Sequence, residues 1–297
     1  MCLLLNAQKM LYLAIKLYLL IHFAPIVCLF LMSAIGLCHR SRKPKQLICC
    51  YKNLYMRHLT FLAVFLFPML MFGQADPQEI VDKAIAAHGG ERYIQQEIQF
   101  DFRDRSYTYR NDGGNYRYTR SAKSDEKQFL DVLTNSGFNR WQEGELVTLT
   151  AKELKAYHES VNSVVYFAIL PYFLNDAAVN KRYLGQKSIK GTNYHKIEVT
   201  FDEEGGGSDH DDVYVYWIDA TDYSLDYLAY SYEVNGGGVR FREAYNPRQV
   251  SGITFQDYVN YKHNKDTPVA SLDDIFVAGG LKELSRIELK NIGLVNN

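Results

Sequence analysis

The chain has 297 residues, 34 of them acidic and 33 basic, and its two parts differ sharply in chemistry. All 34 Asp and Glu residues follow Ala75 and all five cysteines precede it, so disulfides are excluded from the part after Ala75. Eight of the Lys and Arg residues also precede Ala75, which leaves 25 basic against 34 acidic residues, a net charge of about −9. Because nucleic-acid binding depends on cationic neutralisation of phosphates, this charge argues against nucleic acid as a partner.

Residues 56–75, MRHLTFLAVFLFPMLMFGQA, have the order of parts found in a signal peptide. A short basic start precedes an apolar stretch, and Gly73 and Ala75 occupy the −3 and −1 positions of a cut before Asp76. The apolar stretch is shorter than the roughly 20 residues that span a bilayer. We therefore predict a cleaved signal peptide and an exported protein, periplasmic or extracellular.

Residues 1–55 form a hydrophobic and basic extension that has two interpretations. The run 17–38 is long enough to span a membrane, and the basic residues that follow it favour the cytoplasmic side. Alternatively, Met56 is the true start and the extension is no part of the mature protein. The protein is membrane-anchored only under the first interpretation, and only if the extension is retained.

The folded part, residues 76–297, is predicted as a single domain that opens with an amphipathic helix. Asp76 suits the N-cap, Pro77 the first turn, and Glu79 the third position of a capping box. An apolar stripe follows at helical spacing, and Gly89-Gly90 ends the helix. The stripe consists of Ile80, Val81, Ala84 and Ile85.

Most of the remaining sequence alternates apolar and polar residues as strands do. Strands are predicted from Ile98, at 116–121, 126–134, 137–142, 145–149, 181–190, 194–202, 212–219, 225–235, 238–246, 252–263 and 283–293. Strands and helices do not alternate along the chain, so an antiparallel sheet is expected.

A second helix is predicted over 151–170, with a capping box formed by Thr150 and Glu153 and an end at Pro171. Its last eight residues, SVVYFAIL, are apolar on every face, which is typical of a helix enclosed by protein. The predicted fold is therefore mainly β (α+β). We expect a curved antiparallel half-open β-barrel of about 10–12 strands wrapped on this central helix.

Several stretches resemble known families. LGQKSIKGTNYHKIEVTF (184–201) and ADPQEIVDKAIAAHGG (75–90) resemble the periplasmic lipoprotein-carrier (LolA/LolB-like) superfamily. Residues 211–232 and 240–261 are more similar to an uncharacterised family of secreted Bacteroidota proteins. In the carriers a concave apolar sheet lidded by helices shelters acyl chains, so the resemblance implies a lipid or lipoprotein acyl chain as partner.

Aromatic and apolar residues of the second helix and the strands are candidates for the lining of a ligand cavity. These candidates are Tyr166, Phe167, Leu170, Tyr172, Phe173, Phe201, Trp217 and Tyr230. The alternative is that they fill the core, as side chains do in small barrels.

Three carboxylates and an imidazole, Asp209, His210, Asp211 and Asp212, follow a run of three glycines. Such groups bind Ca²⁺ or a softer metal, although the spacing matches no EF-hand or zinc motif. A solvated hairpin tip is the competing interpretation. With His195 folded close to them, these residues would make a metal-assisted hydrolase.

No nucleophile-elbow, zinc-protease or phosphate-loop motif is present in the sequence. The leading hypothesis is a monomeric, cofactor-free binding or carrier protein for a lipid, lipoprotein or other amphiphile. The alternatives are the metal-assisted hydrolase and a non-catalytic module that binds an envelope protein along an edge strand. An exposed apolar edge near 252–263 would favour the second alternative.

Overall fold

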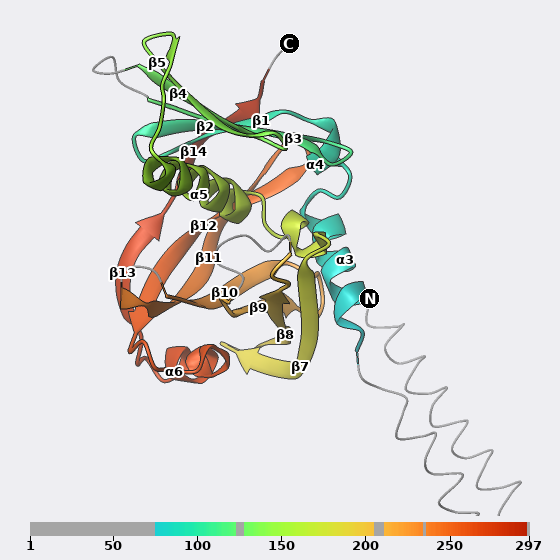
Figure 1. Ribbon diagram of the computed structural model, residues 1–297. Coiled ribbons are helices and arrows are strands. Elements are labelled where there is room, and N and C mark those ends of the chain that lie inside the picture. The colour runs from blue at the N-terminus through green and yellow to red at the C-terminus, as the bar shows by residue number, and fades with distance from the viewer. Residues whose placement is uncertain (1–74, 123–127, 205–210, 234–235, 296–297) are drawn as a thin grey trace, which may run out of the picture. The chain divides into compact units, whose positions relative to one another are not determined.

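Two antiparallel sheets of seven strands each make up most of the computed structural model, which describes residues 75–122, 128–204, 211–233 and 236–295 (Figure 1). Neither sheet closes on itself, because each order has two different end strands. The mainly β, antiparallel, half-open architecture expected from the sequence is confirmed. The described part of the chain holds fourteen strands in two sheets, more than the 10–12 strands expected.

Sheet A has the order β14-β1-β2-β3-β4-β5-β6. Its strands are β1 (Ile98–Phe102), β2 (Arg105–Asp112), β3 (Asn115–Ala122), β4 (Phe129–Thr134), β5 (Gly137–Gln142), β6 (Glu145–Leu146) and β14 (Leu289–Leu294). All but β14 follow one another along the chain, each antiparallel to its neighbour. The strand expected over 145–149 is only two residues long.

Sheet B has the order β13-β12-β11-β10-β9-β8-β7. Its strands are β7 (Val179–Ile189), β8 (Thr192–Phe201), β9 (Tyr214–Asp219), β10 (Leu225–Tyr232), β11 (Gly238–Val250), β12 (Ile253–His263) and β13 (Lys282–Ile287). Strand β12 lies between β11 and β13. An exposed edge near 252–263 would have favoured the envelope-module alternative, but this segment is an interior strand.

The chain passes from sheet B to sheet A at Glu288, the one residue between β13 and β14. Strand β13 pairs with β12, whereas β14 pairs with β1. The buried carboxylate of Asp257 holds this crossing, because it accepts hydrogen bonds from the Leu289 backbone nitrogen at 3.0 Å and from Arg248 at 2.9 Å. The single strand expected over 283–293 is thus two strands in different sheets.

The first described helix, α3 (Pro77–His88), begins as predicted. Asp76 caps it by accepting from the Gln78 backbone nitrogen at 2.9 Å. Glu79 pairs with Lys83 at 2.6 Å, and no capping-box bond from it is recorded among the described residues. The apolar stripe of α3 packs against sheet B, in a cluster that includes Val81 and Leu228. A short helix, α4 (Arg92–Gln95), follows before β1.

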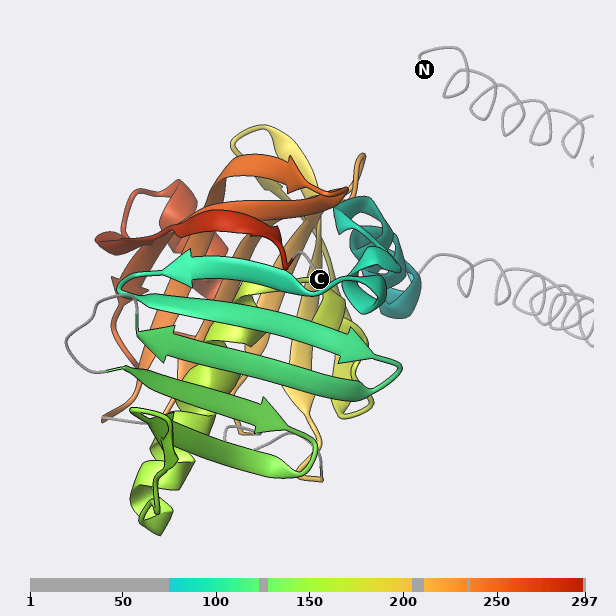
Figure 2. The same cartoon turned by 90° about the horizontal axis from the view of Figure 1, so that it is seen from above.

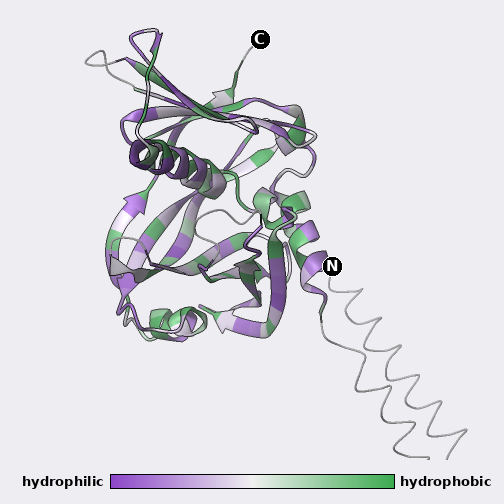
Figure 3. Cartoon of the chain, viewed as in Figure 1, coloured by the Kyte–Doolittle hydropathy of each residue, from purple (hydrophilic) through white to green (hydrophobic). Residues whose placement is uncertain are grey.

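The second predicted helix is α5 (Ala151–Ala168), which lies between the two sheets (Figures 1 and 2). Its capping box is present: the Thr150 nitrogen donates to Glu153 at 3.0 Å, and the Glu153 nitrogen donates to the Thr150 hydroxyl at 3.3 Å. The first turns of α5 are hydrophilic, and a 3₁₀ turn, η1 (Tyr172–Asn175), follows the helix (Figure 3).

The far face of sheet B carries a third apolar cluster, which includes Trp217 and Phe241. A short 3₁₀ turn, η3 (Val269–Ser271), and helix α6 (Leu272–Val277) cover it. The buried carboxylate of Asp273 accepts from Lys196 at 2.7 Å and from the Trp217 indole at 3.1 Å, which ties α6 to the sheet. None of the helices in the described residues is both long and apolar enough to cross a membrane.

Candidate ligand-binding site

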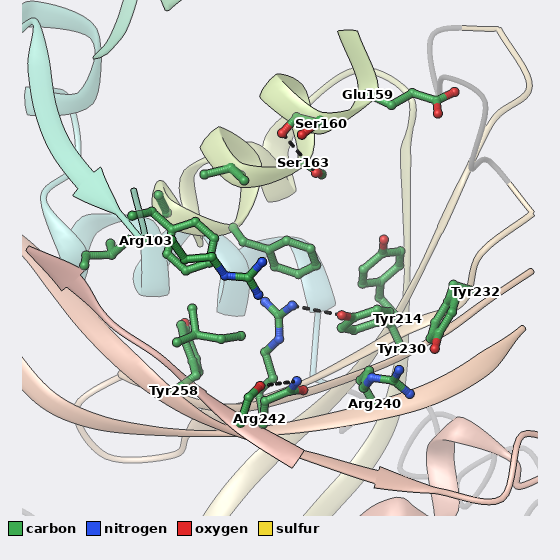
Figure 4. Close-up of a pocket in the computed structure, with 18 of the residues that line it drawn as sticks. Arg103, Glu159, Ser160, Ser163, Tyr214, Tyr230, Tyr232, Arg240, Arg242 and Tyr258 are labelled. Carbon is green, nitrogen blue, oxygen red and sulfur yellow. Dashed lines mark hydrogen bonds between the residues drawn. The ribbon is translucent and has the colours of Figure 1, made fainter. Parts of the chain in front are cut away.

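A cavity of about 860 Å³ lies between α5 and sheet B (Figure 4). Small-molecule sites in proteins commonly measure roughly 300–1,000 Å³, so this cavity has the size of a binding site. Helix α5 forms one wall and strands of sheet B form the other, with contributions from the ends of β1 and β14. Its lining is mixed, apolar on one part and rich in tyrosine and arginine on another.

The wall on α5 arises from helical spacing. Ala156, Ser160, Ser163 and Phe167 follow one another at intervals of three or four residues and line the cavity together with Val164. The opposite face of the helix packs against sheet A through Val161, Val165 and Ile169, which are fully buried. The SVVYFAIL stretch was expected to be enclosed on every side. Instead one face enters the core and the other faces the cavity.

An ion cluster holds α5 against sheet A. The carboxylate of Asp131, which is 0% exposed, accepts from Arg120 at 2.8 Å and from Arg140 at 2.6 Å. Arg120 also donates to the hydroxyl of Ser160 at 2.7 Å. The Arg140 guanidinium lies 3.6 Å from the ring centre of Tyr157. Because both Ser160 and Tyr157 are on α5, this cluster sets the position of the cavity wall.

The opposite wall is set by the alternation of side chains along the strands of sheet B. Arg240 and Arg242 on β11 and Tyr230 on β10 line the cavity. Phe241, between the two arginines, belongs to the cluster on the far face of the sheet. The alternation of side chains along β11 therefore directs both arginines to the cavity and Phe241 to the opposite face of the sheet.

Arg242 is the most enclosed charged group of this wall, with 7% of its surface exposed. Its Nη2 donates to the Tyr230 hydroxyl at 2.8 Å, and its guanidinium carbon lies 3.9 Å from the ring centre of Phe167. Its Nε is buried and has no hydrogen-bond partner in the described structure. Arg242 thus connects the helix wall to the sheet wall while part of its hydrogen-bonding capacity is unused.

Aromatic rings line the space around Arg242. Tyr230 stacks on Tyr214 with ring centres 5.3 Å apart and lies 5.4 Å from Phe167. On β12, the hydroxyl of Tyr258 accepts from Gln256 at 2.7 Å, and burial raises the pKa of Tyr258 to about 12. This phenol is therefore neutral near pH 7. The wall combines apolar ring faces with hydroxyl groups, a composition suited to amphiphilic ligands.

The residues predicted to bind ligand divide between the cavity and the core. Phe167 and Tyr230 line the cavity. Tyr166 packs on Phe173 and Phe201 beside it, with ring centres 5.2 Å and 6.4 Å away. Four of the eight belong to the clusters of the core: Tyr172 and Phe173 under sheet A, Leu170 with α3, and Trp217 on the far face of sheet B. The assignment of these eight residues to ligand binding stays a prediction.

Sequence reasoning did not select the arginines of this site. Arg103 lies in the turn between β1 and β2, at a φ of 55°, and also lines the cavity. The sequence signal available was Arg240-Phe241-Arg242, two cations at strand spacing around an aromatic residue. The partnership of Arg103 with this pair has no local signal, because it depends on how sheet A meets sheet B.

Of the predicted metal ligands, Asp209 and His210 lie outside the described residues. Asp211 is exposed and Asp212 is buried at the cavity lining. Within the described ranges, no three His, Cys, Asp or Glu side chains are grouped as metal ligands would be. The metal site over 209–212 therefore stays a prediction.

His195, the proposed catalytic partner of that loop, lies outside the cavity lining. Its Nδ1 is 3.2 Å from the Tyr183 hydroxyl, and its ring stacks on Tyr223. Burial lowers the pKa of His195. These contacts describe a half-buried histidine held between two tyrosines.

Several solved structures are similar to the chain. A DUF1329 family protein from Desulfovibrio piger is 10% identical, with a TM-score of 0.43 over 74% of this chain and 94% of that one. A LolA superfamily protein from Nitrosomonas europaea is 11% identical, with a TM-score of 0.40 over 75% and 96%. A putative outer membrane lipoprotein-sorting protein domain from Vibrio parahaemolyticus is 10% identical, with a TM-score of 0.35 over 62% and 86%.

No curated protein matches the chain. The resemblance to an uncharacterised family, drawn from the sequence, is confirmed by a family model that matches residues 57–288. That match covers most of the chain, including both walls of the cavity. The chain belongs to DUF6503, a family of unknown function.

Proposed function

We propose that this protein binds an amphiphile, a lipid or the acyl chain of a lipoprotein, in the cavity between α5 and sheet B. The observation that carries the proposal is the half-buried apolar face of α5. Val164, Phe167 and Ala168 line the cavity from a helix whose other face is packed in the core. Apolar surface left uncovered beside a space of about 860 Å³ favours an apolar occupant.

The two kinds of lining also favour a ligand with two kinds of surface. Apolar side chains, among them Phe102, Ile287 and Leu289, come from the ends of strands near the crossing between the sheets. The tyrosines, Arg240 and Arg242 come from the middle strands of sheet B, and Arg103 reaches the same cavity from the β1–β2 turn of sheet A. An acyl chain along the first group would place a polar headgroup beside the second.

We further propose that the protein acts outside the cytoplasm. Support comes from the signal-peptide pattern of residues 56–75. The family match begins at Arg57, within that pattern, and leaves out the extension 1–55. Exported carriers of amphiphiles move apolar molecules through an aqueous compartment, a task that requires an enclosed apolar cavity.

The test is to isolate the protein from an envelope fraction and analyse it by native mass spectrometry and by lipid extraction. We expect an amphiphile to accompany the protein in a defined molar ratio. A protein that carries none, and that fails to bind a fluorescent fatty-acid probe after delipidation, contradicts the proposal.

Two neighbouring positions on α5 provide a matched pair of variants. Ser163 lines the cavity, whereas Asn162 is exposed and is absent from the lining. Ser163→Trp puts a large ring into the cavity and should abolish probe binding at an unchanged melting temperature. Asn162→Trp adds the same ring elsewhere on the helix and should bind the probe normally. Equal binding by the two variants would place the ligand elsewhere.

A further inference from the structure

Two cationic side chains reach into the cavity from different sheets. Arg242 comes from β11 in sheet B and Arg103 from the β1–β2 turn in sheet A. Figure 4 shows their guanidinium groups directed toward one another inside the cavity. Two like charges oriented in this way repel, and an anion placed between them turns that repulsion into attraction.

Among the described residues, no ion pair joins either arginine to a carboxylate, and the carboxylates that also line the cavity are Glu159 and Asp212. Within the described parts of the chain, the ion pairs recorded involve other arginines and lysines, and none includes Arg103 or Arg242. The carboxylate of Glu159, also at the lining, pairs with Lys155 at 3.6 Å. In Figure 4, Glu159 points away from Arg242.

Arg242 is nearly buried and, within the described structure, forms no ion pair with a carboxylate, which is unusual for a charged side chain. Charged side chains that are buried are normally paired, because leaving a charge without a partner away from water is costly. Arg242 is 7% exposed, and its contacts with Phe167 and Tyr230 stabilise the cation without neutralising it. Its unpartnered Nε shows that a donor beside the cavity is unused.

We propose that Arg242 and Arg103 bind the anionic headgroup, a carboxylate or a phosphate, of the amphiphile in this cavity. This inference rests on the proposed function, because it assumes that the ligand has an acyl chain that lies in the cavity. Guanidinium groups suit both headgroups, since their planar donors match two oxygens of either anion. The Tyr230 hydroxyl holds the Arg242 guanidinium in position for this role.

The test compares ligands that share a chain and differ in headgroup charge. Hexadecanoate, hexadecyl phosphate and hexadecanol are titrated into the delipidated full chain by calorimetry, with acetate and inorganic phosphate as chain-free anions. We expect both anionic amphiphiles to bind roughly 10- to 100-fold more tightly than hexadecanol, the range that charge-assisted hydrogen bonds provide.

Substitution of the arginines identifies the residues responsible. Arg242→Gln and Arg103→Gln should each lower the affinity for hexadecanoate about tenfold or more and leave that for hexadecanol unchanged. Arg182→Gln is the control, because Arg182 is an exposed arginine of β7 paired with Glu198 and is outside the lining. If Arg242→Gln proves unfolded by its melting curve, Arg103→Gln decides alone, since Arg103 is an exposed turn residue.

The outcomes separate the headgroup inference from the proposed function. Equal binding of hexadecanol and hexadecanoate, or a preference that survives both substitutions, overturns the headgroup inference and leaves the amphiphile proposal standing. Acetate or phosphate binding as tightly as the amphiphiles, in an arginine-dependent way, shows a free-anion site and contradicts the acyl-chain proposal. Failure of all five ligands to bind overturns both.

Discussion

Arg242 and Tyr230 lie on neighbouring strands of sheet B and meet inside the cavity, where Arg242 Nη2 donates to the Tyr230 hydroxyl at 2.8 Å. This is the one hydrogen bond that the structure records for the Arg242 guanidinium among the described residues. The bond orients a nearly buried cation, which also packs on the Phe167 ring, so one phenolic oxygen supplies the recorded hydrogen bond of this guanidinium.

Removing that oxygen should therefore affect the protein measurably. Tyr230→Phe leaves a buried charged donor without its partner, which costs about 1–3 kcal/mol of unfolding free energy. Urea denaturation of the ligand-free protein measures the loss. Tyr232→Phe is the control, because Tyr232 also lines the cavity but forms no recorded hydrogen bond to Arg242. Equal stability of the two variants would show that the Arg242–Tyr230 bond contributes nothing.

The carboxylate of Asp131 should be one of the most sensitive positions in sheet A. Asp131→Ala leaves Arg120 and Arg140 without a counter-charge next to α5, and breaking a buried pair in this way costs about 3–5 kcal/mol. Thermal and urea unfolding measure the effect. Asp104→Ala removes an exposed carboxylate paired with Arg105, and the expected cost is below about 1 kcal/mol. If the two substitutions lower the unfolding free energy by similar amounts, the buried Asp131 cluster is not the stabilising feature that we describe.

Asp273 has the corresponding role on the far face of sheet B. Asp273→Ala leaves Lys196 and the Trp217 indole without their shared acceptor, and about 3–5 kcal/mol should be lost. The Trp217 fluorescence should also shift as α6 loosens. Helix α6 and the cavity lie on opposite faces of sheet B. The folded part of the Asp273→Ala sample should therefore bind the fluorescent fatty-acid probe with nearly unchanged affinity. A large loss of affinity in that part would indicate that the faces are coupled.

His88 should make the stability of the protein depend on pH. Burial lowers the pKa of His88 from 6.5 to about 4, and its Nε2 accepts from the Leu225 backbone nitrogen at 3.0 Å, which requires the unprotonated ring nitrogen. The unfolded chain therefore binds a proton at His88 near pH 6.5, whereas the folded chain does so only near pH 4. Stability should fall as the pH falls through this window, by about 3 kcal/mol in total.

The contribution of His88 is measured as a difference, because carboxylates titrate in the same range. The unfolding free energy of the natural protein should drop more steeply from pH 6.5 to 4 than that of His88→Gln. His263→Gln, at the exposed end of β12, should keep the steep dependence. If the unfolding free energies of the natural protein and of His88→Gln fall in parallel between pH 6.5 and 4, His88 is not the cause of the pH dependence.

Local signals in the sequence determined most of the elements. Thr150 and Glu153 define the start of α5, and Gly89 ends α3 at a φ of 150°. Alternating residues mark the strands, because side chains of a strand point to opposite faces in turn. These features depend only on residues close together in the chain, so the antiparallel, mainly β class follows from the sequence alone.

The tertiary structure alone decided how the strands divide and where the cavity lies. The crossing at Glu288 depends on Asp257, a residue of β12 that binds the start of β14. The cavity lining includes Arg103 and Arg242, which come from different sheets and are far apart in the sequence. Such contacts follow from the packing of whole sheets around α5, and no local pattern of residues encodes that packing.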